Sequence, residues 1–530
     1  MEELREDSIN IKDASVWASK YIGKDVTAAN ISYLINYGRV KKFGDKASTR
    51  ISLSDLKSYY DTQRNDREEI WKGQLGDDLN WALSFEQYKE SETTKHVHRL
   101  HPYKGKFIPQ LVEYFIDEHT DKFKKEIYFK KGDIILDPFS GSGTTLLQSN
   151  ELGIHAVGVD VSAFNSLISN CKVKNHQTGA LSSVLETITN SLYNFIHGSR
   201  TIAFENALLN ELKDFNSKNF PVPEYKRKVK NKEINEKIYG KEKEKEFSQI
   251  YEKLTKEFDI QLHQENDDTF LGKWYINSVR EEIDFVFKEI KKIKNSDINK
   301  VASIVLSRTI RSCRATTHAD LATLKDPMTK TYYCVKHGKI CKPLFSIYKL
   351  WRRYSKDTIK RINDFERLRT ETHQICLTGD SRNVDIFEEI KKKNSAFGEL
   401  LKKQKIKGIF SSPPYVGLIN YHEQHAYAYD LFGLERRDEM EIGPLYKGKG
   451  KEAKKSYVEG ISSVLNNCKK FLVDNYDVFL VANDKHELYP LIADNSGMKI
   501  VNQYKRPVLN RTEKDRAAYA EIIFHLKEKG

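Results

Sequence analysis

The spacing of hydrophobic residues separates the chain into parts of different character. Short apolar runs at 133–137 and 156–160, each ending in an acidic residue, predict buried strands. Similar runs return only after residue 370, at 374–380, 407–415, 478–482 and 521–526. Strands that alternate with helical segments are typical of an α/β fold with a doubly wound, Rossmann-like parallel sheet, which we predict for residues 95–175 and 371–530.

The stretch between these two parts has another pattern. From 176 to 370 long charged helical patterns dominate and strand signals are few, and residues 226–232 form a very basic patch. We therefore predict that residues 176–370 are a mostly helical insertion into the sheet, or a separate domain.

Residues 1–62 predict a small unit of their own, and a polar connector follows at 63–94. A helix around residues 16–21 ends at Gly23, and Thr27 caps a second helix, which Gly38 ends. The remaining predicted elements are two short strands at 39–43 and 50–53 and a third helix capped by Ser54.

This order of elements resembles the excisionase-type winged helix-turn-helix. That family places its second helix in the major groove of DNA and its wing on the sugar-phosphate backbone. The resemblance implies DNA contacts by Arg39, Lys41, Lys42 and Arg50. The alternative is a small helical cap that packs on the next domain.

A glycine-rich turn follows the strand at 133–137 and opens a helix, in the sequence Asp137-Pro138-Phe139-Ser140-Gly141-Ser142-Gly143-Thr144-Thr145. Such a turn lets the backbone approach a ligand closely. It lacks the third glycine of a dinucleotide fingerprint and the Gly-Lys-Ser/Thr of a phosphate loop, which favours a nucleoside without a pyrophosphate. Asp160, at the end of the next strand, can bind the two hydroxyls of a ribose.

The tetrapeptide Ser412-Pro413-Pro414-Tyr415 directly follows another predicted strand. Two prolines restrict the backbone, so the carbonyl of Pro413 and the hydroxyl of Ser412 can both accept hydrogens from one exocyclic amine. Tyr415 offers a flat face on which a base flipped out of a duplex can stack. A lone Pro-Pro-Tyr is also a turn or ligand motif of other domains, but its occurrence with the turn at 137–145 favours the amine-binding interpretation.

Both motifs resemble those of the DNA methyltransferases that modify exocyclic amines, and the resemblance covers about residues 95–175 and 370–526. It implies a methyltransferase sheet, S-adenosyl-L-methionine as cofactor and double-stranded DNA as substrate. The catalytic residues that it implies are Ser412, Pro413, Pro414 and Tyr415. The cofactor-binding residues that it implies are Asp137, Pro138, Phe139, Ser140, Gly141, Gly143, Thr144, Thr145, Asp160, Asp380 and, around the methionine end, Lys106, Phe107 and Pro109. Taken singly, Asp160 and Asp380 are also typical of strand-end turns or helix caps.

Ser412 bears on which base is modified. The family has serine at this position in cytosine-N4 enzymes and mostly Asp or Asn in adenine-N6 enzymes, so we expect transfer to cytosine N4, with adenine N6 as the alternative. The cofactor turn precedes the Ser-Pro-Pro-Tyr motif, and this order resembles the subgroup whose target-recognition region lies between the two. We expect the modification enzyme of a restriction-modification system, with a cognate restriction endonuclease as a further partner.

Composition adds little to this picture. Lys and Arg number 88 against 75 Asp and Glu, a formal net charge of +13, which suits a polyanionic partner but is also common in Lys-rich proteins of AT-rich bacteria. The charged start and the lack of any stretch of eighteen apolar residues predict a cytoplasmic protein without membrane contact. Six cysteines without regular spacing predict reduced thiols.

A further basic pattern lies inside the insertion. Arg308, Arg311 and Arg314 stand at helical spacing, which predicts a basic stripe suited to DNA phosphates. The alternative is an ordinary solvated face of a helix.

A group of metal-binding residue types follows it. Cys334, His337 and Cys341 have metal-like spacing, and Cys313 and His318 are conceivable further ligands. The spacing is irregular for a structural zinc site and the sequence does not identify the fourth ligand, so no metal is assigned.

Missing motifs exclude related chemistries. No Pro-Cys dipeptide is present, so methylation of cytosine carbon 5 has no candidate thiolate nucleophile. The His-x-Glu and Pro-Cys-x-x-Cys pair of a zinc deaminase is also missing. The N-terminal unit disfavours an RNA methyltransferase. A winged-helix regulator with a decayed methyltransferase fold is a remaining alternative, and the intact Ser-Pro-Pro-Tyr motif speaks against it.

Overall fold

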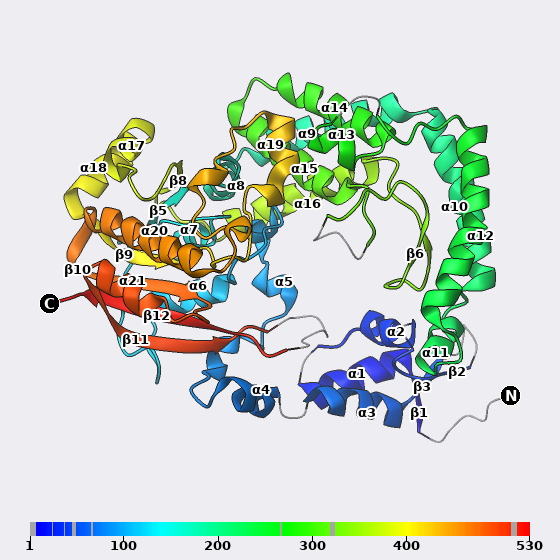
Figure 1. Ribbon diagram of the computed structural model, residues 1–530, viewed down its shortest axis with the longest axis horizontal. Coiled ribbons are helices and arrows are strands. Elements are labelled where there is room, and N and C mark those ends of the chain that lie inside the picture. Colours follow the sequence, from blue (N-terminus) through cyan, green and yellow to red (C-terminus); the bar gives the residue numbers. More distant parts are fainter. Residues whose placement is uncertain are drawn as a thin grey trace.

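The computed structural model describes residues 7–23, 25–36, 38–44, 49–64, 67–264, 268–318, 324–509 and 517–530. A seven-stranded sheet with its flanking helices forms the lobe at the left of Figure 1, and the helices of the insertion form an arch above and to the right of it. The fold is therefore of the mixed α/β class that the sequence predicts.

The sheet has the spatial order β11-β12-β10-β9-β4-β5-β8. Its strands are β4 (Ile134–Asp137), β5 (His155–Asp160), β8 (Gln374–Thr378), β9 (Ile406–Ser411), β10 (Leu472–Ala482), β11 (Met498–Pro507) and β12 (Ala520–Glu528). The first five of these are parallel, and β12 is antiparallel to β10 and to β11. The chain adds β5 and β8 on one side of β4, and then β9 and β10 on the other. The order thus reverses between β4 and β9, and open α/β sheets bind ligands at the carboxyl ends of the strands at such a point.

Helices cover both faces of the sheet. They are α6 (Pro109–Ile116), α7 (Thr144–Glu151), α8 (Ala163–Val173), α17 (Ile386–Lys393), α18 (Ser395–Gln404), α20 (Lys451–Lys469) and α21 (Tyr489–Asn495). The helix α19 (Ala426–Phe432) instead belongs to the core of the insertion. In β4, Ile134 and Leu136 belong to the core shared with α20, whereas Ile135 belongs to the core shared with α6 on the opposite face. Burial on both faces explains the continuous apolar runs that reveal the parallel strands in the sequence.

The insertion packs directly onto the sheet lobe. Its elements are α9 (Thr178–Ile196), α10 (Arg200–Asn219), α11 (Glu224–Lys230), α12 (Glu236–Glu257), α13 (Phe270–Trp274), α14 (Asn277–Lys291), α15 (Ser296–Cys313), a hairpin of β6 (Tyr332–Cys334) and β7 (Lys339–Cys341), and α16 (Tyr348–Glu366). Phe164 and Ile168 of α8 share one hydrophobic core with α9, α14, α15 and α16. Trp351 of α16 is fully buried there, and its Nε1 donates a hydrogen bond to Thr189 Oγ1 at 3.0 Å.

The N-terminal unit has the predicted order of elements and one strand more. It consists of β1 (Ser8–Asn10), α1 (Ile11–Ile22), α2 (Ala28–Asn36), β2 (Lys42–Phe43), β3 (Arg50–Ser52) and α3 (Leu53–Arg64), with the sheet order β1-β3-β2. Gly23 has a φ of +67° at the end of α1, and Thr27 Oγ1 accepts from the backbone N–H of Asn30, as predicted. The cap of α3 differs from the prediction. Ser52 Oγ accepts from the N–H of Asp55 at 3.1 Å, whereas the hydroxyl of Ser54 donates to Asp7.

The segment predicted as a polar connector is packed against the sheet. It contains α4 (Arg67–Leu75), α5 (Glu90–Thr93) and the 3₁₀ helix η1 (Trp81–Ser84), and a second 3₁₀ helix, η2 (His96–Arg99), follows it. Leu79 is buried, and the N–H of Asn80 donates to the carbonyl of Lys505 at 2.7 Å. These residues cover the edge strand β11, which would otherwise present unpaired backbone groups.

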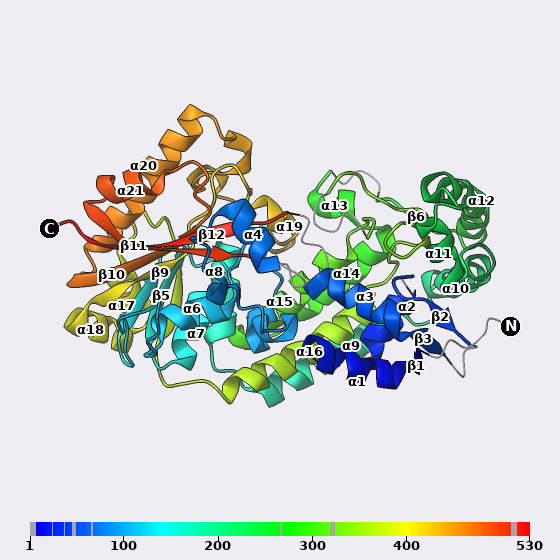
Figure 2. The same ribbon diagram turned by 90° about the horizontal axis from the view of Figure 1, so that it is seen from below.

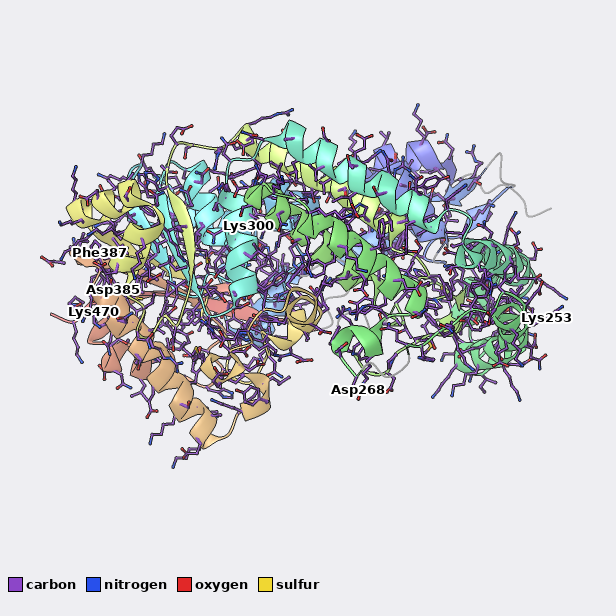
Figure 3. All side chains as sticks on the ribbon, turned by 90° about the horizontal axis from the view of Figure 1, so that it is seen from above. Lys253, Asp268, Lys300, Asp385, Phe387 and Lys470 are labelled. Atoms are coloured by element: carbon purple, nitrogen blue, oxygen red, sulfur yellow. The ribbon has the colours of Figure 1, made fainter. Side chains whose placement is uncertain are left out.

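The sheet lobe lies at one end of the molecule and the arm, which we define as α10, α11 and α12, at the other. Figure 2 shows the N-terminal unit beside the arm, and Lys230 Nζ of α11 donates to the carbonyl of Gly38 at 3.2 Å. In Figure 3, Lys253 of α12 marks the arm, and Asp385, Phe387 and Lys470 mark the far end of the sheet lobe. Within the described ranges, every helix is too short or too polar to cross a bilayer.

Candidate active site

A pocket opens where the sheet order reverses, and its outline encloses about 870 Å³ with the open solvent at its mouth included. It lies at the carboxyl ends of β4, β5, β8 and β9. The predicted residues that line it are Lys106, Phe107, Asp137, Pro138, Phe139, Ser140, Gly141, Thr144, Asp160, Asp380, Ser412 and Pro414. The two motifs, about 270 residues apart in the chain, therefore meet in one cavity.

The glycine loop is pressed between two neighbours. Gly141 has a φ of +50°, and a Cβ at this position would lie 3.1 Å from the hydroxyl of Tyr103. Gly143 has a φ of +76°, and a Cβ there would lie 2.9 Å from Ser169 Oγ on α8. Glycine is required at both positions because of the left-handed backbone and the lack of space.

Asp160 holds this loop in place. Its carboxylate accepts hydrogen bonds from the N–H of Gly141 at 2.8 Å, the N–H of Ser162 at 2.8 Å and Nδ2 of Asn165 at 3.1 Å. Burial raises the pKa of Asp160 to about 6, and these hydrogen bonds offset part of that increase. Asn165 is buried, and its Oδ1 has no hydrogen-bond partner among the described residues, so this pocket offers an unused acceptor.

Asp137 links the loop to the second motif. The hydroxyl of Ser411, the last residue of β9, donates to Asp137 Oδ1 at 2.5 Å. Burial raises the pKa of Asp137 to about 6, although the hydroxyls of Ser411 and Thr145 oppose the increase. This hydrogen bond fixes the end of β9, and with it Ser412, relative to the end of β4.

The side chain of Tyr415 is held by Glu521. Its hydroxyl donates to Glu521 Oε1 at 2.8 Å, and Glu521 Oε2 lies 3.3 Å from Nη1 of the buried Arg506. Burial, followed by the charge of Glu521, raises the pKa of Tyr415 well above its usual value, so the phenol stays protonated. The hydroxyl is thus occupied, and only the ring is left for contact with a base.

Asp380 and Lys106 have partners within the protein. Nε and Nη2 of Arg382 donate to the two carboxylate oxygens of Asp380 at 2.9 and 2.6 Å, so an adenine amine would have to share these oxygens. Lys106 Nζ donates to the carbonyl of His98 at 2.8 Å, and burial lowers the pKa of Lys106 to about 8. Their roles as cofactor contacts stay predictions.

The other predicted cofactor and catalytic residues lie outside this pocket. Gly143 and Pro109 begin α7 and α6, and Thr145 Oγ1 donates to the carbonyl of Phe410 at 3.3 Å, which ties α7 to β9. Pro413 is buried and Tyr415 is partly buried, next to the lining residues Ser412 and Pro414. The direct contacts predicted for these residues stay predictions.

Several lining residues were not predicted. They are Tyr103, Gly105, Ser142, Val161, Ser162, Asn165, Gly379, Ser381, Tyr421, Met440, Glu441, Ile442 and Val464. Tyr103 lies three residues before Lys106, which was predicted to contact the methionine end, and could have been singled out there. The stretch from Tyr421 to Ile442 carries no motif, and only the path of the chain after Ser412 brings it to the cavity.

The predicted stripe on α15 is wrong for Arg308 and Arg314. Both side chains are buried, because α15 is a central helix of the insertion. Arg308 Nη1 lies 2.6 Å from Asp357 Oδ2, and its guanidinium stacks 4.2 Å from the ring of Tyr354. Arg314 lies over the ring of Tyr427. Of the three arginines, Arg311 alone is partly exposed.

The basic residues predicted for DNA contact in the N-terminal unit differ in exposure. Arg39 is exposed, and Lys41 and Lys42 are partly exposed. Arg50 is bound within the unit, because its Nε donates to Ser8 Oγ at 3.0 Å and its Nη2 to the carbonyl of Ser8. Arg50 thus ties β3 to β1, and its contact with DNA stays a prediction.

The candidate metal ligands come together at the β6–β7 hairpin. His318, Cys334, His337 and Cys341 each offer a ligand atom within 4.8 Å of the others. Cys313, the other residue considered, is buried in the helical core and is not in this group.

Comparisons with known proteins identify the family of this chain. A family model for DNA methylases of the N6/N4 type matches residues 10–170, which include the glycine loop and Asp160. The type II methyltransferase M.MjaII of Methanocaldococcus jannaschii is 46% identical over 522 residues, 98% of this chain and 96% of that protein. M.MvaI of Kocuria varians is 30% identical over 24% of this chain and 27% of its own length, and M.BsoBI of Geobacillus stearothermophilus is 38% identical over 14% and 13%.

Proposed function

Because this chain belongs to the N6/N4 family of DNA methylases, we propose that it transfers the methyl group of S-adenosylmethionine to N4 of cytosine at a specific site in double-stranded DNA. The single observation that carries this proposal is the shared pocket. Gly141 and Asp160 line one part of it, and Ser412 and Pro414 line another part of the same cavity.

The pocket fits the cofactor that DNA methylases of this family generally use. Asp160 and the free Oδ1 of Asn165 are acceptors for the hydroxyl and amino groups of a nucleoside with an amino-acid tail. Lys106 is a cation for the carboxylate at the methionine end. When bound, S-adenosylmethionine supplies an electrophilic methyl group on its sulfonium sulfur.

The Ser-Pro-Pro-Tyr motif would then activate the amine. An amine conjugated to a base ring is a poor nucleophile, and acceptors for its hydrogens stabilise the charge that develops on nitrogen during transfer. Ser412 Oγ and the carbonyl of Pro413 are those acceptors. The ring of Tyr415, held by Glu521, would stack on the flipped base.

Cytosine is favoured over adenine by Ser412, because the amino-methyltransferase motif has serine in cytosine-N4 enzymes. Adenine N6 is the second candidate, since the family as a whole includes both activities. The discriminating residue, Ser412, lies in the pocket itself. Identification of the modified nucleoside distinguishes cytosine from adenine without knowledge of the recognition sequence.

DNA would be held by the N-terminal unit together with the arm that carries it. Arg39, which follows α2, and Lys41 and Lys42, at the start of β2, are the basic side chains proposed for phosphate contact, because they are at least partly exposed. The relatives carry the name of type II methyltransferases, and we include in the proposal a role in restriction-modification with a cognate endonuclease.

The test is nucleoside mass spectrometry of plasmid DNA incubated with the purified chain and S-adenosylmethionine. We expect N4-methylcytosine from the wild-type protein and from Ser463→Ala, an exposed serine on α20 that serves as matched control, and much less from Ser412→Ala. If N6-methyladenine were found in place of N4-methylcytosine, the modified base would be adenine and the cytosine assignment would be wrong. The lack of any methylated nucleoside would overturn the whole proposal.

A further inference from the structure

The β6–β7 hairpin carries a cluster of ligand residues that methyl transfer does not use. We propose that His318, Cys334, His337 and Cys341 bind one zinc ion, and that this ion fixes the hairpin against the arm that carries the N-terminal unit. The proposal does not depend on which base is methylated or on whether methyl transfer occurs at all.

The distances match a tetrahedral zinc site. Cys334 Sγ lies 3.6 Å and Cys341 Sγ 3.5 Å from Nδ1 of His337. With zinc bonds of about 2.3 Å to sulfur and about 2.05 Å to nitrogen, a tetrahedral site places sulfur and nitrogen about 3.6 Å apart. One imidazole nitrogen carries at most one proton and cannot donate well to two sulfurs, whereas one cation between them binds all three atoms.

Backbone geometry explains how the three hairpin ligands converge. In the antiparallel pairing, Cys334 is opposite Lys339 and Cys341 is opposite Tyr332, so both cysteines lie on the same face of the hairpin. The N–H groups of His337 and Gly338 both donate to the carbonyl of Cys334, at 3.1 and 2.7 Å. This tight turn folds His337 back toward the two thiols.

The fourth ligand comes from the chain segment just after α15. Tyr332 accepts a hydrogen bond from the backbone N–H of His318 at 3.0 Å, and its hydroxyl lies 2.8 Å from Nδ1 of the same residue. A hydrogen bond to one ring nitrogen sets the tautomer and orientation of a metal-binding histidine. Because 15 residues separate His318 from Cys334, the spacing along the chain did not identify His318 as the fourth ligand.

The two faces of the hairpin are packed differently. Ile340 belongs to the large core of the insertion and Tyr333 packs against it, whereas the face with the cysteines has a small cluster of Tyr332, Cys334 and Cys341, with Met328 packed against them. A cluster of this size contributes little hydrophobic stabilisation, and small units are commonly stabilised by a metal. Two buried thiols and two imidazoles are the ligand set that zinc prefers over magnesium or calcium.

The hairpin connects the proposed zinc site to the N-terminal unit. Tyr333 on β6 donates from its hydroxyl to Glu236 at 2.7 Å and from its N–H to Glu244 at 2.9 Å, both on α12. On α11, Lys226 Nζ donates to the carbonyl of Val335 at 2.9 Å, and Lys230 contacts Gly38 of the N-terminal unit. Removal of the ion would therefore loosen the hairpin first, and then the contact between α11 and the N-terminal unit.

The first experiment measures metal in the purified full-length chain. We expect one zinc per chain by mass spectrometry of the metal, and loss of that zinc in Cys334→Ser and in His318→Ala. Cys313→Ala is the matched control and should keep the ion, because Cys313 lies outside the cluster. A folded wild-type protein that contains no zinc and takes up none when the metal alone is added would overturn the proposal.

A second measurement keeps the test valid if the variants fail to fold. Replacement of the metal by cobalt in the wild-type protein should give the ligand-field and thiolate-to-cobalt charge-transfer absorption of a tetrahedral site with two cysteines. An octahedral cobalt spectrum, or a Cys334–Cys341 disulfide found in the native protein by mass spectrometry, would contradict it.

The structural role has its own readout. Chelation of the metal should increase hydrogen exchange in β6, β7 and α11 and leave exchange in β4 and affinity for S-adenosylmethionine unchanged. Equal exchange with and without metal at the hairpin and the arm would show that the ion does not fix this contact.

Discussion

The pocket of the sheet lobe and the seat of the N-terminal unit are built in different ways. In the pocket, Asp160 accepts three hydrogen bonds and Ser411 ties β9 to Asp137, so loop and motif are fixed to each other. The arm contacts the N-terminal unit through longer hydrogen bonds, such as the one of 3.2 Å from Lys230 Nζ to the carbonyl of Gly38. Methyl transfer requires reacting atoms in fixed positions, whereas phosphate contacts tolerate adjustment. We therefore expect that methyl transfer and DNA binding can be perturbed separately.

The largest effect is expected at Arg308, which belongs to neither region. Arg308→Ala should lower the free energy of unfolding by about 3 kcal/mol, because it removes a buried guanidinium that pairs with the partly exposed Asp357 and stacks on Tyr354. Arg39→Ala, a change at an exposed arginine, should have no such effect. Denaturant unfolding measures both. Unchanged stability with weaker DNA binding in Arg308→Ala would restore α15 as a DNA-facing helix.

The second effect concerns the cofactor side. Asp160→Ala should weaken S-adenosylmethionine binding by about 1.5–3 kcal/mol, because a charge-assisted pair of hydrogen bonds to the ribose is lost. Titration calorimetry without DNA is the measurement, and Asp494→Ala, a change at an exposed aspartate of α21, is the control. Unchanged affinity in Asp160→Ala would remove this residue from the site.

The third effect concerns the DNA side. Deletion of residues 1–62, or the triple change Arg39→Ala, Lys41→Ala and Lys42→Ala, should weaken DNA binding about tenfold and flatten its dependence on salt, because each phosphate contact contributes a slope of about −0.9. Cofactor affinity should stay the same. A salt dependence identical to that of the full chain would make this unit a structural cap.

The smallest effect is a pH dependence of the pocket. The pKa of Asp160 is raised to about 6, so half of these carboxyls are protonated near that pH and accept hydrogen bonds from ribose less well. Cofactor affinity should be full above pH 7 and fall several-fold as the pH drops through 6 to 5. Asp160→Asn should bind more weakly with a smaller pH dependence, since Asp137 still titrates near 6. An identical pH profile in this variant would assign the effect to another group.

The sequence predicted the pocket better than its surroundings. Strands buried on both faces, such as β4, leave continuous apolar runs, and the glycine loop and Ser-Pro-Pro-Tyr follow two of them directly. The edge strand β11 was missed because four of its ten residues are exposed and polar residues such as Asn502 and Gln503 interrupt its apolar pattern. The arginines of α15 show the reverse error. Helical spacing gives the relative positions of side chains on a helix but does not reveal that other helices surround it.

Contacts between distant segments could not be predicted for a related reason. The bond from Tyr415 to Glu521 joins residues 106 positions apart, and that from Ser411 to Asp137 joins residues 274 apart. Hydrophobic periodicity reports local structure and carries no information on which distant polar groups pair. Hydrogen bonds between distant residues depend on which strands lie next to each other in the sheet. The hydrophobic pattern predicted the strands but not their order.

The central claim is that Ser412 and Tyr415 act on the base and not on the cofactor. The most direct test measures S-adenosylmethionine affinity and transfer of tritiated methyl groups to DNA in Ser412→Ala and Tyr415→Ala, with Ser463→Ala as control. We expect unchanged cofactor affinity and reduced transfer in both variants, with an additional loss of about 1–3 kcal/mol of base stacking in Tyr415→Ala. Transfer at the wild-type rate in both variants would contradict it.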